Sequence, residues 1–206
     1  MNEIRAATEK SYHDAYAAQE YAHGTYYWGP AIDGEIIADH PHAEFSNGHF
    51  TQVPVMVDRD FDEGFLFTNY SLSTEVEARS DLFTLWQDTT QYYTNIALKL
   101  YPEAAYNETY LRNEIYNYED LTSLGIPINE LTSSFVRRSA IFSDAVVNCP
   151  SLHIAKSVAH AGLPAYKLVF NAGYQFHGAT GSFLFSNVTN GALLAYHSYA
   201  FLSSLI

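Results

Sequence analysis

Cysteine, basic residues and long apolar runs are scarce in this sequence, and each shortage limits what the chain can do. The one cysteine among 206 residues, Cys149, cannot form a disulfide within the chain, so it gives no evidence for an oxidising compartment. Only 10 Lys and Arg stand against 23 Asp and Glu, and the formal net charge of -13 disfavours nucleic acid and anionic membrane surfaces as partners. The longest apolar stretch, Ala192 to Ile206, is shorter than the roughly 20 residues that a membrane-spanning helix needs.

The first residues, Met1 to Arg5, lack the apolar run of a secretory signal, so no signal peptide is expected on this chain. Its 48% hydrophobic content suits one globular unit, and no repeat or Pro/Gly/Ser-rich linker divides it. We therefore expect residues 1–206 to form part of one domain. Three Asn-x-Ser/Thr sites, close to the number expected by chance, leave glycosylation open; they are Asn69, Asn107 and Asn187.

Apolar spacing and helix-breaking residues predict strands that are separated by helices. A strand is expected at Pro54–Val57, an apolar run of the kind that is buried on both faces in a parallel sheet, and a second strand at Ala165–Phe170. Helices are expected at residues 3–21, 75–87, 91–100, 108–117, 129–147 and 150–160. Short extended pieces joined by turns are expected at 25–42, and a glycine-containing loop after Phe170.

Such a pair of strands cannot form a complete sheet, because a parallel sheet needs several neighbouring strands. The pattern therefore predicts an α/β protein whose sheet is incomplete and carries a helical insert.

A cluster of carboxylates follows the first predicted strand, in the run Val53-Pro-Val-Met-Val-Asp58-Arg-Asp60-Phe-Asp62-Glu63-Gly64. Open α/β sheets hold their sites at the carboxyl ends of strands, which makes this position a candidate site. The strand that runs into Asp62-Glu63-Gly64 resembles the acid segment of type B carboxylesterases, lipases and cholinesterases. In that family the Glu of this turn is the triad acid, so the resemblance implies this role for Glu63.

Three further segments are similar to the same family. The second strand followed by His177-Gly178-Ala-Thr-Gly-Ser-Phe resembles its histidine segment, which implies that His177 is the base. Trp28-Gly-Pro-Ala-Ile-Asp33-Gly34 and Asp144-Ala-Val-Val-Asn-Cys149-Pro150 also resemble family segments. The order, Glu63 before His177, agrees with the order of acid and base in these hydrolases.

The resemblance implies the C-terminal part of a fungal-type α/β-hydrolase that acts on small-molecule or lipid esters, needs no cofactor or metal, and in its full-length form is secreted. No Gly-x-Ser-x-Gly elbow occurs in the chain, and no Gly-Gly-rich stretch offers oxyanion donors. We therefore expect Glu63 and His177 to supply the acid and base of a Ser-Glu-His triad whose serine is absent here. The isolated chain should be inactive.

Other interpretations of the whole chain remain open at this stage. The fold could serve binding or adhesion in a non-catalytic, cholinesterase-like protein, although the retention of Glu63 and His177 argues against it. The chain could also be a truncated, inactive gene product, since it begins abruptly and has few strands.

Asp58, Asp60 and Asp62 imitate the start of a calcium-binding loop, because they occupy alternate positions. Such a loop has Gly at its sixth position and Glu at its twelfth, where this sequence has Glu63 and Asn69. A solvated turn or an acid segment is the better interpretation.

Several histidines could suggest a metal site. His153 and His160 could lie on one side of a predicted helix, but no third ligand is evident, and surface or capping roles are favoured for them and for His40 and His42. Cys149 resembles a half-cystine of the family, and a buried free thiol is equally compatible with the sequence.

Overall fold

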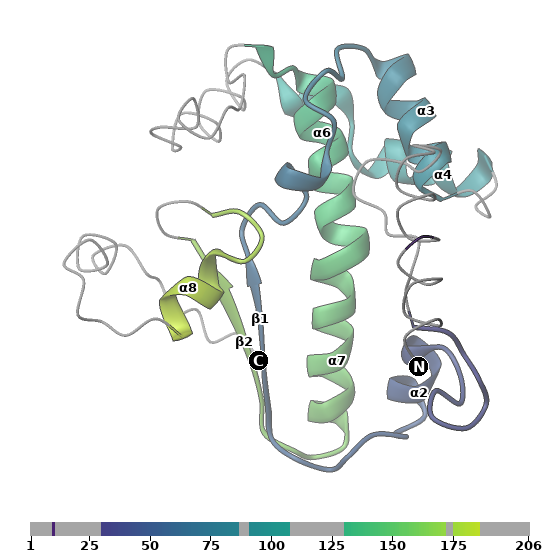
Figure 1. Cartoon of the computed structure of the whole chain (residues 1–206), viewed down its shortest axis with the longest axis vertical. Helices are drawn as coiled ribbons and strands as arrows, with labels where there is room; N and C mark the ends of the chain where they lie inside the picture. Colours follow the sequence, from purple (N-terminus) through teal and green to yellow (C-terminus); the bar gives the residue numbers. More distant parts are fainter. Residues whose placement is uncertain (1–9, 11–29, 87–90, 108–129, 172–174, 186–206) are drawn as a thin grey trace.

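The computed structural model describes residue 10 and residues 30–86, 91–107, 130–171 and 175–185. Within them, a long helical rod stands beside a pair of strands, with two shorter helices at one end of the rod, another at the opposite end and one beside the strands (Figure 1). The predicted helices at 3–21, apart from Lys10, and at 108–117 lie outside the described residues, as does the segment around Trp28.

The described sheet consists of β1 (Val55–Asp60) and β2 (Ala165–Phe170), which run parallel. The register pairs Val55 with Ala165 and Asp60 with Phe170, so the carboxyl ends of both strands meet at one edge. This confirms the second predicted strand and extends the first through the acidic residues as far as Asp60.

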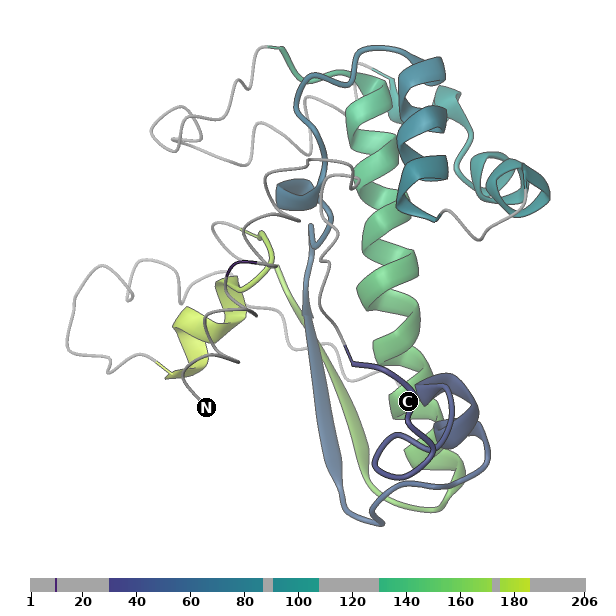
Figure 2. The same ribbon diagram turned by 45° about the vertical axis from the view of Figure 1, so that its right-hand side comes forward.

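The expectation that the first strand is buried on both faces is wrong for the described structure. Side chains of β1 alternate between half-buried and exposed, and Met56 is 67% exposed. The paired Tyr166 is 52% exposed on the same face. Alternation of this kind is typical of a sheet that packs on one side only. Here the packed side faces the helix α7 (Cys149–His160), as Figures 1 and 2 show together.

The rod consists of α6 (Ser133–Phe142), the π-helical segment η5 (Ser143–Asn148) and α7 (Cys149–His160). We predicted two helices broken at Pro150, but the helical path continues through it. Proline at this position clashes with the carbonyl four residues earlier in an α-helix, and the wider π turn before it accommodates the ring without ending the helix. Thr132 caps the rod by accepting a hydrogen bond from the Phe135 N–H at 3.2 Å.

Two helices of the insert agree with the sequence: α3 (Glu75–Leu85) starts at the capping residue Thr74, and α4 (Gln91–Leu100) has the predicted bounds. Two short helices were missed. These are α2 (Pro41–Ser46), which packs on α7, and α8 (Ala179–Phe185), which replaces part of the expected loop. Single turns, η1 (Phe65–Phe67) and η2 (Glu103–Tyr106), complete the described elements.

The core lies where the acid turn meets the rod and the insert. One cluster contains the buried side chains of Phe65, Leu72, Tyr106, Leu131, Phe135, Val136 and Phe176. Phe65 and Phe176 contact within it, with ring centroids 4.7 Å apart, and each stands next to the segment of a predicted site residue. Packing of these two rings therefore fixes the segment of Glu63 and the segment of His177 against the core.

Candidate active site

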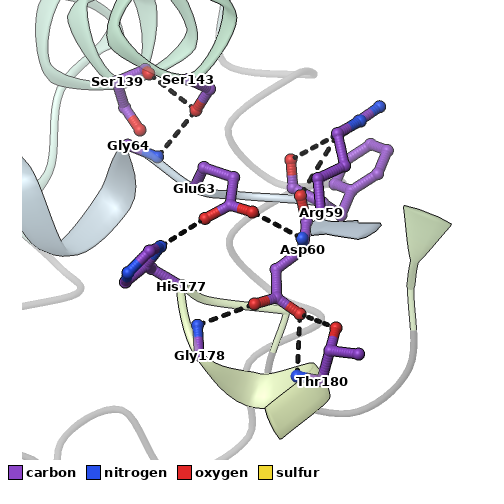
Figure 3. Close-up of polar contacts among 10 residues, drawn as sticks. Arg59, Asp60, Glu63, Gly64, Ser139, Ser143, His177, Gly178 and Thr180 are labelled. Carbon is purple, nitrogen blue, oxygen red and sulfur yellow. Dashed lines mark hydrogen bonds and ion pairs between the residues drawn. The ribbon is translucent and has the colours of Figure 1, made fainter. Parts of the chain in front are cut away.

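Glu63 lies buried in the turn that follows β1 (Figure 3). Its Oε1 accepts a hydrogen bond from the Asp60 N–H at 2.6 Å, which satisfies one side of the carboxylate. The next residue, Gly64, donates its N–H to Ser143 Oγ at 2.7 Å, and Ser143 donates in turn to the Ser139 carbonyl at 2.9 Å. These bonds tie the turn to the junction between α6 and η5.

Gly64 is required by close approach rather than by an unusual backbone angle. A Cβ at this position would stand 2.1 Å from the Ser139 carbonyl oxygen and 2.9 Å from Ser143 Oγ. Thr68 Oγ1 also donates to the Gly64 carbonyl at 2.7 Å. Only glycine lets the turn press this closely on the rod, which places the preceding Glu63 at the sheet end.

His177 meets Glu63 across the end of the sheet. Its Nδ1 lies 2.6 Å from Glu63 Oε2, although the two residues are 114 positions apart in the chain. Because a carboxylate oxygen accepts, the proton of this bond belongs to Nδ1, and in the neutral ring Nε2 then keeps its lone pair. The edge-on ring of Phe67, with its centroid 5.0 Å away, borders the imidazole.

Exposure differs sharply between the two partners. The Glu63 side chain is 4% exposed, whereas that of His177 is 52% exposed. The acid is thus fixed inside the protein, and the imidazole can meet a group from outside the described residues.

Asp60 connects the two sides of this pair through groups that the sequence did not single out. Its buried carboxylate accepts from the Gly178 N–H at 2.7 Å and from the Thr180 N–H at 2.9 Å. The Thr180 hydroxyl donates to the same carboxylate at 2.5 Å. In the sequence Asp60 is one member of an acidic run, and its position at the end of a strand is the signal that could have singled it out.

The calcium-loop alternative finds no support in the placement of the aspartates. Asp58 is exposed on β1, and Asp60 is buried with its carboxylate bound to the Thr180 N–H in the first turn of α8. Within the described ranges, no group of three or more His, Cys, Asp or Glu side chains is arranged to hold a metal ion.

The other histidines considered as ligands and the cysteine either join two helices or are exposed. His153 stacks on His42 with ring centroids 3.9 Å apart, and its Nε2 lies 3.1 Å from the His42 carbonyl oxygen, so the pair joins α7 to α2. His160 and His40 are exposed. Cys149 is an exposed free thiol, which contradicts the alternative of a buried one.

The described part of the chain contains no helix that is both long and apolar enough to cross a membrane. Asn69 and Asn107 of the potential glycosylation sites are exposed, and Asn187 lies outside the described residues.

Comparison with known proteins supplies independent findings. The sequence model described as "Carboxylesterase family" matches residues 1–198. Lipase 2 of Geotrichum candidum is 28% identical over 125 residues, which make up 60% of this chain and 20% of the lipase. The crystal structure of Aspergillus niger EstA has a similar fold, with a TM-score of 0.64 and 21% identity over 84% of this chain and 32% of that chain. The chain thus spans a fifth of one relative and about a third of the other.

Proposed function

The chain belongs to the carboxylesterase family and has part of an α/β-hydrolase fold, and from this premise we propose that Glu63 and His177 act as acid and base of a Ser-Glu-His triad. The nucleophile serine would come from a segment that is not in this sequence, which contains no Gly-x-Ser-x-Gly elbow. The observation that carries the proposal is the 2.6 Å contact between His177 Nδ1 and Glu63 Oε2.

The geometry suits ester hydrolysis in two steps. His177 Nε2 takes the proton of the serine hydroxyl as its oxygen attacks the ester carbonyl carbon, and Glu63 stabilises the imidazolium that forms. The imidazolium then protonates the leaving alkoxide, so an alcohol departs and the acyl group stays on serine. In the second step His177 deprotonates a water molecule, which attacks the acyl-enzyme and releases the carboxylic acid while serine regains its proton.

The difference in exposure supports this division of roles. A base must reach both serine and the leaving group, which the half-exposed His177 side chain permits. The acid only has to orient the ring and offset its charge, and the buried, hydrogen-bonded Glu63 meets that requirement. The substrate class that we propose is a carboxylic ester, either a small molecule or a lipid.

The isolated 206-residue chain provides the first test. We expect it to hydrolyse short p-nitrophenyl esters no faster than its His177→Ala variant, and a fluorophosphonate probe that labels activated serines should not label it. Turnover that the probe abolishes would overturn the proposal, because the chain would then carry its own activated serine.

A chimera provides the positive test. In Lipase 2 of Geotrichum candidum, the segment that corresponds to this chain is exchanged for it, so that the lipase contributes everything upstream. We expect p-nitrophenyl ester hydrolysis that is lost on His177→Ala and on Glu63→Gln. A matched control, Glu77→Gln, changes an exposed glutamate of α3 and should leave turnover unchanged. A folded chimera whose turnover is indifferent to His177 and Glu63 would contradict the proposal.

A further inference from the structure

We infer that Asp60 is a positioning residue, which keeps the imidazole of His177 in register with Glu63 by holding the backbone that follows it. The inference rests on the proposed roles of Glu63 and His177. Asp60 makes no hydrogen bond to the imidazole among the described residues, so it would act through Gly178 and Thr180.

One residue holds both members of the pair. The backbone N–H of Asp60 donates to Glu63 Oε1 at 2.6 Å, while its side chain accepts from the N–H of Gly178, the residue directly after His177. Figure 3 shows the two sets of bonds leaving Asp60 in different directions, one toward the acid and one toward the start of α8. A shift of Asp60 would therefore disturb the distance between Glu63 and His177.

His177 depends on this support because half of its side chain is exposed. On its N-terminal side the chain is fixed by the bridge between Asp62 and Phe176 and by the burial of Phe176. On its C-terminal side Gly178 has φ at +90°, a backbone conformation outside helix and strand, and the next N–H, that of Ala179, donates to the Phe176 carbonyl at 3.0 Å. The carboxylate of Asp60 holds the Gly178 N–H at that point.

A carboxylate suits the task better than its amide would. The Oδ2 atom accepts from Gly178, and Oδ1 accepts from both the N–H and the hydroxyl of Thr180. All three partners donate, and an ionised carboxylate offers two acceptor oxygens. An asparagine offers one oxygen, so its NH₂ group would face either the Gly178 N–H or the donors of Thr180. Asp60→Asn should therefore lose part of the support and Asp60→Ala all of it.

A purely structural role makes a different prediction. Asp60 also satisfies an N–H in the first turn of α8, as a capping side chain does, and a cap alone would change stability without changing the state of His177. The state of the imidazole therefore separates positioning from capping. In the wild-type contact the neutral ring carries its proton on Nδ1, and a ring released from Glu63 would distribute the proton over both nitrogens.

The experiment records ¹⁵N spectra of the histidine side chains in the 206-residue chain, at a pH where the ring is neutral. The samples are the wild type, Asp60→Asn, Asp60→Ala, Thr180→Val and the control Thr74→Ala, which removes the exposed cap of α3. We expect one Nδ1-protonated species for His177 in the wild type and in Thr74→Ala, and a mixture of tautomers that grows from Asp60→Asn to Asp60→Ala. Thr180→Val, which removes one donor and keeps both N–H bonds, should remain close to the wild type.

Amide exchange gives a second readout on the same samples. Protection of the Gly178 and Thr180 amides should fall by roughly tenfold or more in Asp60→Ala, the factor that corresponds to about 1.4 kcal/mol. Thr74→Ala should leave that protection unchanged relative to other amides. If Asp60→Ala does not fold, the same comparison is made on Asp60→Asn.

An unchanged His177 tautomer in a folded Asp60 variant overturns the inference. So does a change of equal size in Thr74→Ala, because the signal would then follow stability alone. Failure of this inference can be distinguished from failure of the proposed triad. A chimera that is inactive, because the lipase serine does not reach His177, does not affect the tautomer result. An active chimera combined with an unchanged His177 tautomer in Asp60→Ala would refute the positioning role of Asp60 and leave the triad intact.

Discussion

The described part of the molecule buries charge in two regions and neutralises it in two different ways. In the helical layer Arg138, with 0% exposure, pairs with Asp81 at 2.5 Å and donates to the Phe67 carbonyl at 2.7 Å. At the end of the sheet, the described partners of the Glu63 and Asp60 carboxylates are backbone N–H groups, a hydroxyl and one imidazole. The Arg59 guanidinium also lies there, but it donates to the backbone carbonyls of Asp60 and Phe61 at 3.2 and 3.3 Å. The carboxylates of the helical layer thus pair directly with permanent cations, whereas those of the sheet end contact a cation only when His177 is protonated.

This difference separates a structural charge from one that can take part in chemistry. Burial lowers the pKa of Arg138, and the neighbouring Asp81 carboxylate opposes that shift. Because Asp81 belongs to α3 and Arg138 to α6, their ion pair also holds the two helices together. Arg137 repeats the arrangement by pairing with Glu75 and donating to the Tyr101 and Leu98 carbonyls at 2.5 and 2.7 Å. The sheet end instead holds buried acids beside a group that can gain and lose a proton.

Arg138→Ala should have the largest effect on stability. Removal of the guanidinium leaves the Asp81 carboxylate without its partner, and breaking a buried pair in this way costs about 3–5 kcal/mol. Chemical denaturation measures the loss of unfolding free energy. Arg79→Ala, which removes an exposed bond from α3 to Asn95 of α4, is the control and should cost under about 1 kcal/mol. Equal losses of unfolding free energy in both variants would mean that burial does not determine how much each arginine contributes to stability.

Gly64→Ala should be next in size. The added methyl meets the Ser139 carbonyl at 2.1 Å, and such overpacking costs about 1–3 kcal/mol. It should also move Glu63 and weaken its bond to His177. The control is Gly181→Ala. Apart from its chain neighbours and the backbone of its own helix, the new Cβ has no atom of the described residues within 4 Å, and the helical position in α8 favours alanine. Thermal unfolding should separate the two, and a Gly64→Ala protein as stable as Gly181→Ala would contradict the close approach.

Thr74→Ala should cost about 1 kcal/mol, because the hydroxyl caps α3 by accepting from the Glu77 N–H. The loss should appear in denaturation of the helical layer and leave the Glu63–His177 contact intact. A changed His177 ¹⁵N signal in this variant would show that the helical layer and the sheet end are coupled, which contradicts their separation.

The smallest effect should be a pH dependence in the same cap. Hydrogen bonds from Ser73, first from its N–H and then from its hydroxyl, together with the Thr74 N–H lower the pKa of Glu77 from 4.5. A lowered pKa in the folded state adds stability above pH 4.5, and that stability is lost as the pH falls through the folded value. The wild type should thus exceed Glu77→Gln in melting temperature near neutral pH and match it in strong acid. A difference that persists in strong acid would contradict this assignment.

The sequence predicted the site pair and much of the fold for identifiable reasons. Apolar runs with clear breakers located β2 and α4, and the capping pattern at Thr74 located α3. The partnership of Glu63 and His177 came from the resemblance of their segments to a family. No periodicity in the sequence would have paired residues 114 positions apart.

The features that the sequence did not reveal depend on tertiary context. The rod continues through Pro150 because a π turn precedes it, and nothing local distinguishes such a turn from a helix end. The helix α8 starts at Ala179, and the Thr180 N–H in its first turn is bound by Asp60, a partner 120 positions away. One face of β1 is exposed in the described structure, whereas the apolar composition of the strand suggested burial on both faces.

The most direct test of the central claim is the kcat of the lipase chimera for a p-nitrophenyl ester, with and without His177. We expect turnover that His177→Ala lowers by roughly 10⁴-fold or more and that Glu63→Gln also lowers strongly, while Glu77→Gln leaves it unchanged. Turnover that survives His177→Ala in a folded chimera would contradict the assignment of this histidine as the base.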